Sequence, residues 1–220
     1  MSEQNKKTLE VYDRLAQKYM DNTVVHDSMD PEKAKKKQAQ LESFLLESFK
    51  GIPSDCKILE IGSGDGVNAL FLKEAGSNVV ASDVAEAFLD SCRQRGLTTL
   101  KLNAIEDELP NDLSGVLAWR TFVHFAKTDL EETLRKIHSA LVPDGIFVFN
   151  VFNREDSSVD EQWKDFPDEY EMGEERYFAY YTEEYMNGLL EKTGFKIDRF
   201  FKQGGKTGEK WLCYVVKNRS

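Results

Sequence analysis

The sequence predicts an α/β protein whose doubly wound, mostly parallel seven-stranded sheet ends in an antiparallel hairpin. From Cys56 onward, short β-rich runs alternate with amphipathic helical stretches, an order typical of a parallel sheet with helices on both faces. Glycine follows three of the expected helices, at Gly76, Gly96 and Gly194, where it readily ends a helix. The polar turn 203–209 between the last two expected strands predicts the hairpin.

The first fifty residues predict two helices. Apolar residues recur with helical spacing from Leu9 to Tyr19. A second helix is expected to begin at Asp30-Pro31, where Asp caps the helix and Pro occupies its first turn. We expect it to end at Gly51.

The remaining elements follow in chain order. The expected strands span residues 56–61, 78–82, 98–102, 115–119, 146–151, 195–201 and 210–216. One expected helix follows the glycine loop and ends before Gly76. The others span about 85–95, 128–141 and 182–192. Ligands of such sheets bind at the carboxyl ends of the strands, so residues that follow the strands are the candidates for a site.

Length and charge restrict the class of protein. The chain has 220 residues, enough for one α/β domain (1–220) with a full core. Its net charge is −10, which argues against nucleic acid or a membrane surface as a partner, because binding phosphates requires clustered Lys and Arg. The basic run 33–37 is interpreted as a solvated helix face.

The cysteines and the N-terminus predict a reduced, cytoplasmic protein. Cys56, Cys92 and Cys213 lie far apart, without the C-x-x-C or His spacing of a zinc site. Residues 1–8 lack an apolar signal segment, and no run of eighteen apolar residues occurs.

A glycine-rich loop with acidic neighbours follows the first expected strand. Residues 60–66 read EIGSGDG; glycines there let the backbone approach a ligand closely, although a tight strand-to-helix turn would also use them. Glu60 and Asp65 would repel a pyrophosphate but would suit a cationic amino-acid moiety.

A carboxylate follows the second expected strand. Asp83 lies about twenty residues after the glycine loop, where an acidic side chain accepts hydrogen bonds from both hydroxyls of a ribose. The alternative is that Asp83 caps the next helix.

Four motifs in order resemble those of the class I S-adenosylmethionine-dependent methyltransferases. They are ILEIGSGDG (58–66), VVASDVA (79–85), LRKIHSALVPDG (134–145) and LLEKTGF (189–195). The resemblance covers residue 58 to the C-terminus apart from an insertion at 152–181. It implies the Rossmann-like methyltransferase fold, whose seventh strand is antiparallel, and S-adenosylmethionine as the cofactor.

The resemblance also implies which residues hold the cofactor. The glycine loop would face the methionine part, Asp83 the ribose, and Val84 the adenine. Many relatives have Asp at the position of Asn103, whose amide oxygen can also accept a hydrogen bond. The expected cofactor-binding set is Glu60, Gly62, Ser63, Gly64, Gly66, Asp83, Val84, Asn103, Ala104, Ile105 and Arg120.

The segment after the fourth expected strand resembles small-molecule methyltransferases. Residues 119–125 read WRTFVHF and lack the Asn/Asp-Pro-Pro-aromatic motif of relatives that methylate bases or glutamine. In the phosphoethanolamine type, an arginine and a histidine stand at similar places, and the histidine pairs with an N-terminal tyrosine. By that resemblance, residues 1–51 form a helical lid that supplies two candidate tyrosines, Tyr12 and Tyr19. A pair of His124 and Tyr19 is expected to close over the cofactor and take a proton from the acceptor.

Alternatives remain for these aromatic residues. Tyr12, expected to contact the substrate, and Tyr19 are seven residues apart on one helical face, which packing alone would also explain. His124 is alternatively a buried, hydrogen-bonded histidine.

The insertion 152–181 is expected to cover the methyl acceptor. It carries Trp163, Tyr177 and Tyr181 among many carboxylates, a combination that suits a cationic amine; packing on the domain is the alternative. No metal is expected, since Arg120-Thr121 and residues 150–153 stand where metal-dependent relatives have acidic ligands.

The predicted function is methyl transfer to an oxygen or nitrogen of a small-molecule metabolite. One alternative is a regulatory protein that binds S-adenosylmethionine without turnover. Another is a nicotinamide-dependent oxidoreductase, against which Val67, Glu60 and the terminal hairpin all argue.

Overall fold

A computed structural model of the chain describes residues 1–29, 31–157, 159–166, 172–204 and 210–218. Three predicted features therefore lie outside the described residues: the cap at Asp30, most of the turn 203–209, and residues 158 and 167–171 of the insertion.

The elements appear in the predicted order. The helices are α1 (Glu3–Met29), α2 (Pro31–Ser48), α3 (Val67–Glu74), α4 (Glu86–Gln94), α5 (Lys127–Ala140) and α6 (Glu183–Lys192), with short 3-10 turns η1 (Phe122–His124) and η2 (Arg154–Asp156). The strands are β1 (Lys57–Ile61), β2 (Asn78–Asp83), β3 (Thr98–Lys101), β4 (Leu113–Ala118), β5 (Leu141–Asn153), β6 (Glu161–Asp165), β7 (Glu175–Tyr181), β8 (Phe195–Gln203) and β9 (Trp211–Asn218).

The sheet confirms the predicted fold class. Strands β3, β2, β1, β4 and β5 lie side by side in this order and are all parallel. β9 runs antiparallel to β5, and β8 antiparallel to β9. The carboxyl ends of the parallel strands therefore share one edge of the sheet, as ligand binding in such a fold requires.

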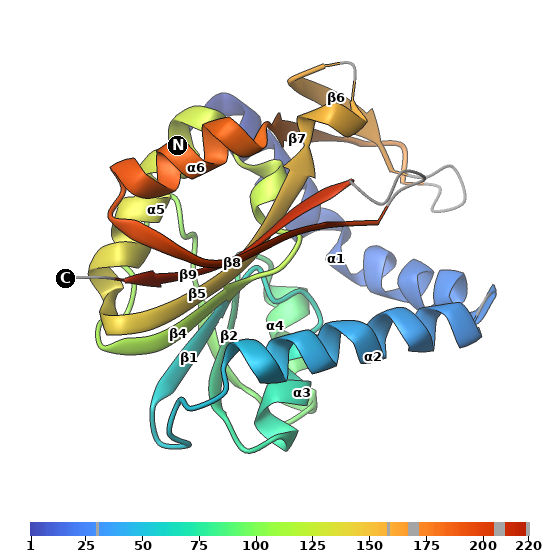
Figure 1. Cartoon of the computed structure of the whole chain (residues 1–220). Helices are drawn as coiled ribbons and strands as arrows, with labels where there is room; N and C mark the ends of the chain where they lie inside the picture. Colours follow the sequence, from blue (N-terminus) through green and yellow to red (C-terminus); the bar gives the residue numbers. More distant parts are fainter. Residues whose placement is uncertain (30, 158, 167–171, 205–209, 219–220) are drawn as a thin grey trace.

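Helices cover both faces of the sheet (Figure 1). On one face, α5 and α6 bury Leu130, Leu134 and Met186 in a core that includes Phe147 and Phe149. On the other face, α2, α3 and α4 bury their apolar sides against β1, β2 and β9. Burial of the two cores is the main force that holds the strand ends in place.

The insertion adds two strands that were not predicted, so the sheet formed by the described residues has nine strands rather than seven. β6 and β7 are antiparallel to each other, and β7 runs parallel to the end of β5. β9 occupies one edge of β5 as far as Phe152, so β7 lies on the other edge, beyond the end of β4. In this way β7 contacts η1, which follows β4, and α1.

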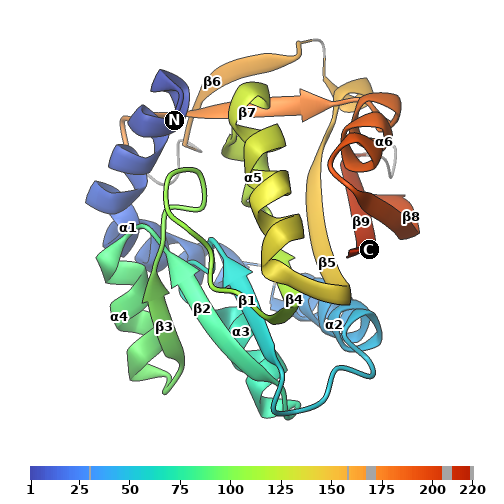
Figure 2. The ribbon, with the colours of Figure 1, turned by 90° about the vertical axis from the view of Figure 1, so that its left-hand side faces the viewer.

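Only part of the predicted lid 1–51 lies over the strand ends. α1 contacts β7 and α4 across that edge (Figure 2). α2 instead buries Leu45 and Phe49 in the core on one face of the sheet. Among the described helices, none is long and apolar enough to cross a membrane.

Candidate functional site

The three glycines of the loop after β1 have different neighbours. All have positive φ, between 54° and 80°. A Cβ at Gly62 would lie 2.5 Å from the hydroxyl oxygen of Thr121, and a Cβ at Gly66 would lie 2.7 Å from the sulfur of Cys92. Apart from its two chain neighbours, a Cβ at Gly64 would have no atom of the described residues within 4 Å. Gly62 and Gly66 are thus required for packing, whereas Gly64 leaves the backbone open to a ligand.

Asp83, at the end of β2, is tied into this loop. Its carboxylate accepts hydrogen bonds from the backbone N–H of Gly64 (3.0 Å) and of Ala85 (3.1 Å). Burial raises the pKa of Asp83. The N-cap residue of α4 is Ala85, so Asp83 orders the turn before the helix and the glycine loop together.

Glu60, in β1, is a buried carboxyl group with only one oxygen partnered by a side chain. Oε1 accepts a hydrogen bond from the amide of Asn68 at 3.0 Å. Oε2 is buried and has no hydrogen-bond partner among the described residues. Burial raises the pKa of Glu60 to about 8. A positively charged ligand group beside the glycine loop would supply the missing partner and would favour the ionised form.

The expected adenine contacts lie at the ends of β2 and β3. Ala104 is buried, and Ile105 packs against the same core; Val84 is half-buried. The amide oxygen of Asn103 accepts a hydrogen bond from the N–H of Ile105 at 3.1 Å, so it orders the local turn. The hydroxyl of Ser63 lies 3.9 Å from the sulfur of Cys92, on the inner side of the loop.

Arg120 occupies a strained position after β4. Its φ is 61°, a value that costs energy for a residue with a Cβ, and its N–H donates to Asn150 Oδ1 at 2.6 Å. Its guanidinium lies 5.8 Å from the ring of Trp211, on the terminal hairpin. The next residue, Thr121, contacts the glycine loop and donates to the carbonyl of Ile61 at 3.0 Å. No local pattern in the sequence predicts this role.

Three polar side chains on one face of α1 attach the helix to the strand ends. Asn5 donates to the carbonyl of His124 at 2.7 Å and accepts from the N–H of Ala126 at 2.8 Å. The hydroxyl of Thr8 accepts from the N–H of Tyr177 at 3.1 Å. Their spacing along the helix places both on the side that faces η1 and β7.

The third of these side chains, Tyr12, pairs with His124. Burial lowers the pKa of His124 to about 3, and the charge of Arg176 contributes, so the ring is neutral. Nδ1 lies 2.9 Å from the carbonyl oxygen of Tyr177 and must donate, because a carbonyl only accepts. Nε2 is therefore the acceptor, and the hydroxyl of Tyr12 donates to it at 3.0 Å.

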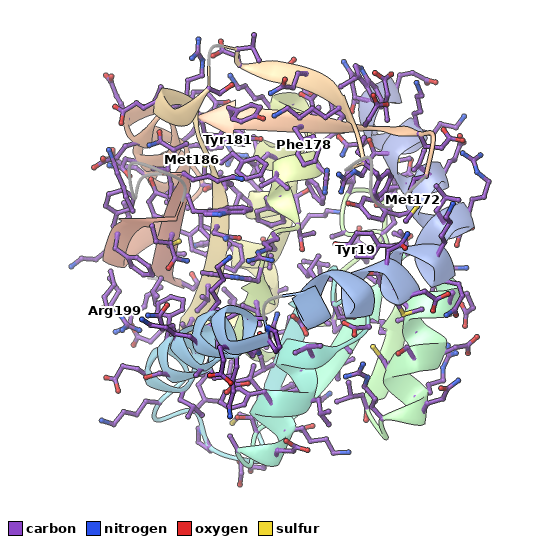
Figure 3. All side chains as sticks on the ribbon, turned by 90° about the vertical axis from the view of Figure 1, so that its right-hand side faces the viewer. Tyr19, Met172, Phe178, Tyr181, Met186 and Arg199 are labelled. Atoms are coloured by element: carbon purple, nitrogen blue, oxygen red, sulfur yellow. The ribbon has the colours of Figure 1, made fainter. Side chains whose placement is uncertain are left out.

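The predicted pair of His124 and Tyr19 is therefore wrong. Seven residues separate Tyr12 from Tyr19, a rise of about 10 Å along a helix, so only one of them reaches His124. The ring of Tyr19 packs against Phe88 and Phe166 with centroids 6.1 Å apart. Figure 3 shows Tyr19 on α1, on the side of the molecule that also holds Met172 and Phe178.

The expected acceptor contacts in the insertion are also corrected. Tyr177 and Tyr181 point from one face of β7 into the main core, and the hydroxyl of Tyr181 donates to the carbonyl of Phe125. Trp163 on β6 pairs with Tyr177 across the ribbon and packs on the same core. Because successive side chains of a strand point to opposite faces, Tyr177 and Tyr181 share the face of β7 that packs on the core. These aromatic side chains therefore stabilise the fold.

The opposite face of β7 points toward His124. It carries Arg176, Phe178 and Tyr180; the ring of Phe178 lies 4.6 Å from the ring of His124. Arg176 donates to the hydroxyl of Tyr12 at 3.1 Å. Arg176 was not predicted as a site residue; its only signal in the sequence is the alternation of side chains along β7.

No group of three or more His, Cys, Asp or Glu side chains suited to a metal ion occurs in the part of the chain that the structure describes.

Comparisons with known proteins agree on one fold. A family model described as a methyltransferase domain matches residues 33–199. Among solved structures, an S-adenosylmethionine-dependent methyltransferase from Clostridium acetobutylicum is similar, with a TM-score of 0.70 and 15% identity over 92% of this chain and 99% of that one. The 1,6-didemethyltoxoflavin-N1-methyltransferase of Burkholderia thailandensis has a TM-score of 0.64 and 19% identity over 94% and 89% of the two chains.

Curated relatives carry a different activity in their name. The chain is 27% identical over 150 residues to the mitochondrial arginine-hydroxylase NDUFAF5 of Mus musculus, which is 66% of this chain and 43% of the relative. The human protein of the same name is 26% identical over the same length. The chain thus spans less than half the length of these relatives.

Proposed function

Because the chain belongs to the methyltransferase domain family, we propose that it transfers a methyl group from S-adenosylmethionine to an oxygen or nitrogen of a small-molecule metabolite. The observation that carries this proposal is the buried Glu60 Oε2, which has no partner among the described residues and lies in the strand that leads into the glycine loop with its open position at Gly64. A carboxylate acceptor at this position suits the cationic methionine part of the cofactor, and it disfavours the pyrophosphate of a nicotinamide dinucleotide.

Each residue at the strand ends then has a role toward the cofactor. Glu60 and the backbone at Gly64 would hold the methionine part. A carboxylate has roughly four acceptor positions, so Asp83 can bind ribose hydroxyls while keeping its bonds to Gly64 and Ala85. Val84 and Ile105 would pack against the adenine.

When bound, S-adenosylmethionine supplies an activated methyl group on a good leaving group. The chain's residues therefore mainly have to align the acceptor and exclude water. α1 does the latter, because it lies across the strand ends and is held there by Asn5, Thr8 and Tyr12.

The geometry favours a positioning role for His124 over that of a general base. With its pKa lowered to about 3, Nε2 holds a proton poorly near neutral pH, and it already accepts from Tyr12. We therefore assign to Tyr12 and His124 the closing of α1 over the site. An acceptor amine that arrives neutral needs no base.

The first test is a calorimetric titration of the protein with S-adenosylmethionine and S-adenosylhomocysteine, with NAD as control. We expect the first two to bind and NAD not to bind. Asp83→Asn should weaken their binding by about tenfold or more, since a charge-assisted hydrogen bond is replaced by a neutral one. Binding of NAD alone would contradict the proposal.

Turnover is tested separately on a panel of small hydroxylated and amino compounds, with product masses recorded. Addition of one CH2 group to a compound would support methyl transfer. Addition of one oxygen atom would instead support a hydroxylase, as in the name of the curated relatives. Cofactor binding without any product on the panel would support the regulatory alternative.

A further inference from the structure

We propose that the methyl acceptor carries a carboxylate or phosphate group, and that Arg176, with Lys164 beside it on β6, binds this anion. The inference rests on the proposed methyltransferase function. It replaces the sequence-based expectation of a cationic amine, which depended on aromatic and acidic side chains in the insertion.

The two faces of the β6–β7 ribbon carry opposite charges. Lys164 is the register partner of Arg176, and Gln162 is the partner of Phe178, so these side chains share the face toward His124. The acidic residues Glu161, Asp165 and Glu175 alternate with them and therefore lie on the other face.

The cationic pair has no carboxylate partner within the described residues. Like charges directly opposite each other destabilise a strand pair. Arg176 instead donates to the hydroxyl of Tyr12, and Lys164 donates to the hydroxyl of Tyr180 at 3.1 Å. No carboxylate of the described residues neutralises either cation, so an anionic ligand group would supply the missing negative charge.

Arg176 also keeps part of its hydrogen-bonding capacity unused. Its Nε is buried and has no hydrogen-bond partner among the described residues, and a buried donor without a partner is costly. The planar edge of a guanidinium formed by Nε and a terminal nitrogen fits a carboxylate or phosphate with two parallel hydrogen bonds.

Aromatic rings near the site already have cations of this chain over them. The guanidinium of Arg176 lies 3.7 Å from the ring centroid of Phe166 and 5.1 Å from that of Phe178. The ammonium of Lys210 lies 5.3 Å from the ring of Phe152. Cation–π attraction at these rings therefore already holds Arg176 and Lys210 in place.

The anion would lie beside the atoms that close α1. Nη1 of Arg176 and Nε2 of His124 both bind the hydroxyl of Tyr12. An acceptor bound by Arg176 would therefore touch the hydrogen-bond chain that holds the helix over the strand ends.

The test uses the full chain saturated with S-adenosylhomocysteine and three probes that share one ring: benzoate, phenyl phosphate and benzylamine. Binding is followed by calorimetry and by the Nε–H signals of the arginines in NMR spectra, assigned with Arg176→Lys. We expect one of the anions to bind about tenfold or more tightly than benzylamine and to shift the Arg176 signal. The tighter of the two identifies the anion.

Arg176→Gln and Arg14→Gln form the matched variants, because each removes one positive charge. Arg14 is exposed and pairs with Glu174. Arg176→Gln should weaken anion binding by about tenfold or more, and Arg14→Gln by less than about twofold. If Arg176→Gln does not fold, two measurements on the unmodified protein still test the inference. They are the preference among the three probes and the shift of the Arg176 Nε–H signal.

Preferential binding of benzylamine, binding of none of the probes, or equal losses in the two variants would overturn the inference, while cofactor binding would still stand. Failure of S-adenosylhomocysteine itself to bind would refute the proposed function, and the acceptor site with it.

Discussion

Glu60 shows how one buried side chain links the fold to the ligand. It lies in β1 with 1% of its surface exposed, and burial raises its pKa to about 8. Between its ordinary pKa of 4.5 and this value, the folded protein holds a proton that the unfolded chain has released. The free energy of unfolding therefore decreases as the pH rises through this range.

Glu60→Gln is expected to remove this pH dependence. The neutral amide does not titrate, so the slope of up to about 1.4 kcal/mol per pH unit that Glu60 contributes should be missing. Urea unfolding of both proteins at several pH values between 4.5 and 8 measures the difference. Parallel curves for the two proteins would show that Glu60 is already ionised in the fold.

Tyr12 and His124 form the second residue-scale feature. Burial raises the pKa of Tyr12 to about 12 and lowers that of His124 to about 3, so the pair keeps one protonation state between those values. A hydrogen bond with a fixed direction then holds α1 at any physiological pH.

Tyr12→Phe should lower the free energy of unfolding by about 1–3 kcal/mol, because it leaves the buried Nε2 of His124 without a donor. It should also raise the KM for S-adenosylmethionine, while the pH profile of kcat keeps its shape. Tyr19→Phe is the control, since it leaves the bond between Tyr12 and His124 in place. A larger effect of Tyr19→Phe, or a shifted pH profile, would restore the general-base hypothesis.

At the scale of elements, the glycines of the loop between β1 and α3 have two different roles. Two of them permit close packing, and one leaves room for a ligand. Gly62 fits against Thr121, and Gly66 fits against Cys92 and Leu97, while Gly64 has open space beside it. All three need positive φ, so alanine is strained at each of them. Only at Gly66 and Gly62 does the added methyl group also meet side chains.

We expect Gly66→Ala to destabilise the fold more than Gly64→Ala, which should cost about 1–2 kcal/mol from its backbone conformation alone. Gly64→Ala should instead reduce the affinity for S-adenosylhomocysteine. Thermal unfolding and calorimetry on both variants separate the two effects. Unchanged affinity in Gly64→Ala would place the cofactor elsewhere.

At the scale of the whole molecule, α1 and β7 form one cover over the strand ends. α1 packs on β7 and α4, and β7 is anchored to the end of β5. β7 also buries Tyr177 and Tyr181 in the main core, whereas α1 packs through the smaller clusters around Val11 and Ala16. α1 is therefore the part that can open without unfolding the sheet.

S-adenosylhomocysteine at about 100 times its Kd should raise the free energy of unfolding by about 2.7 kcal/mol. Hydrogen exchange should slow in α1 and β7 as well as in the glycine loop, because a ligand at the strand ends is enclosed by both. Asp83→Asn at the same ligand concentration serves as control. Slower exchange in the glycine loop alone would mean that α1 is not part of the site.

The sequence by itself determined the order of the elements outside the insertion, the antiparallel hairpin and the positions of the glycine loop and Asp83. These follow from local patterns: apolar periodicity, helix-ending glycines, and carboxylates directly after strands. Only the tertiary structure decided that Tyr12, rather than Tyr19, meets His124, and that Tyr177 and Tyr181 point into the core while Arg176 points to the site. The reason is geometric. Which face of a strand or turn of a helix meets a distant partner depends on register, and a shift of one residue in a strand reverses it.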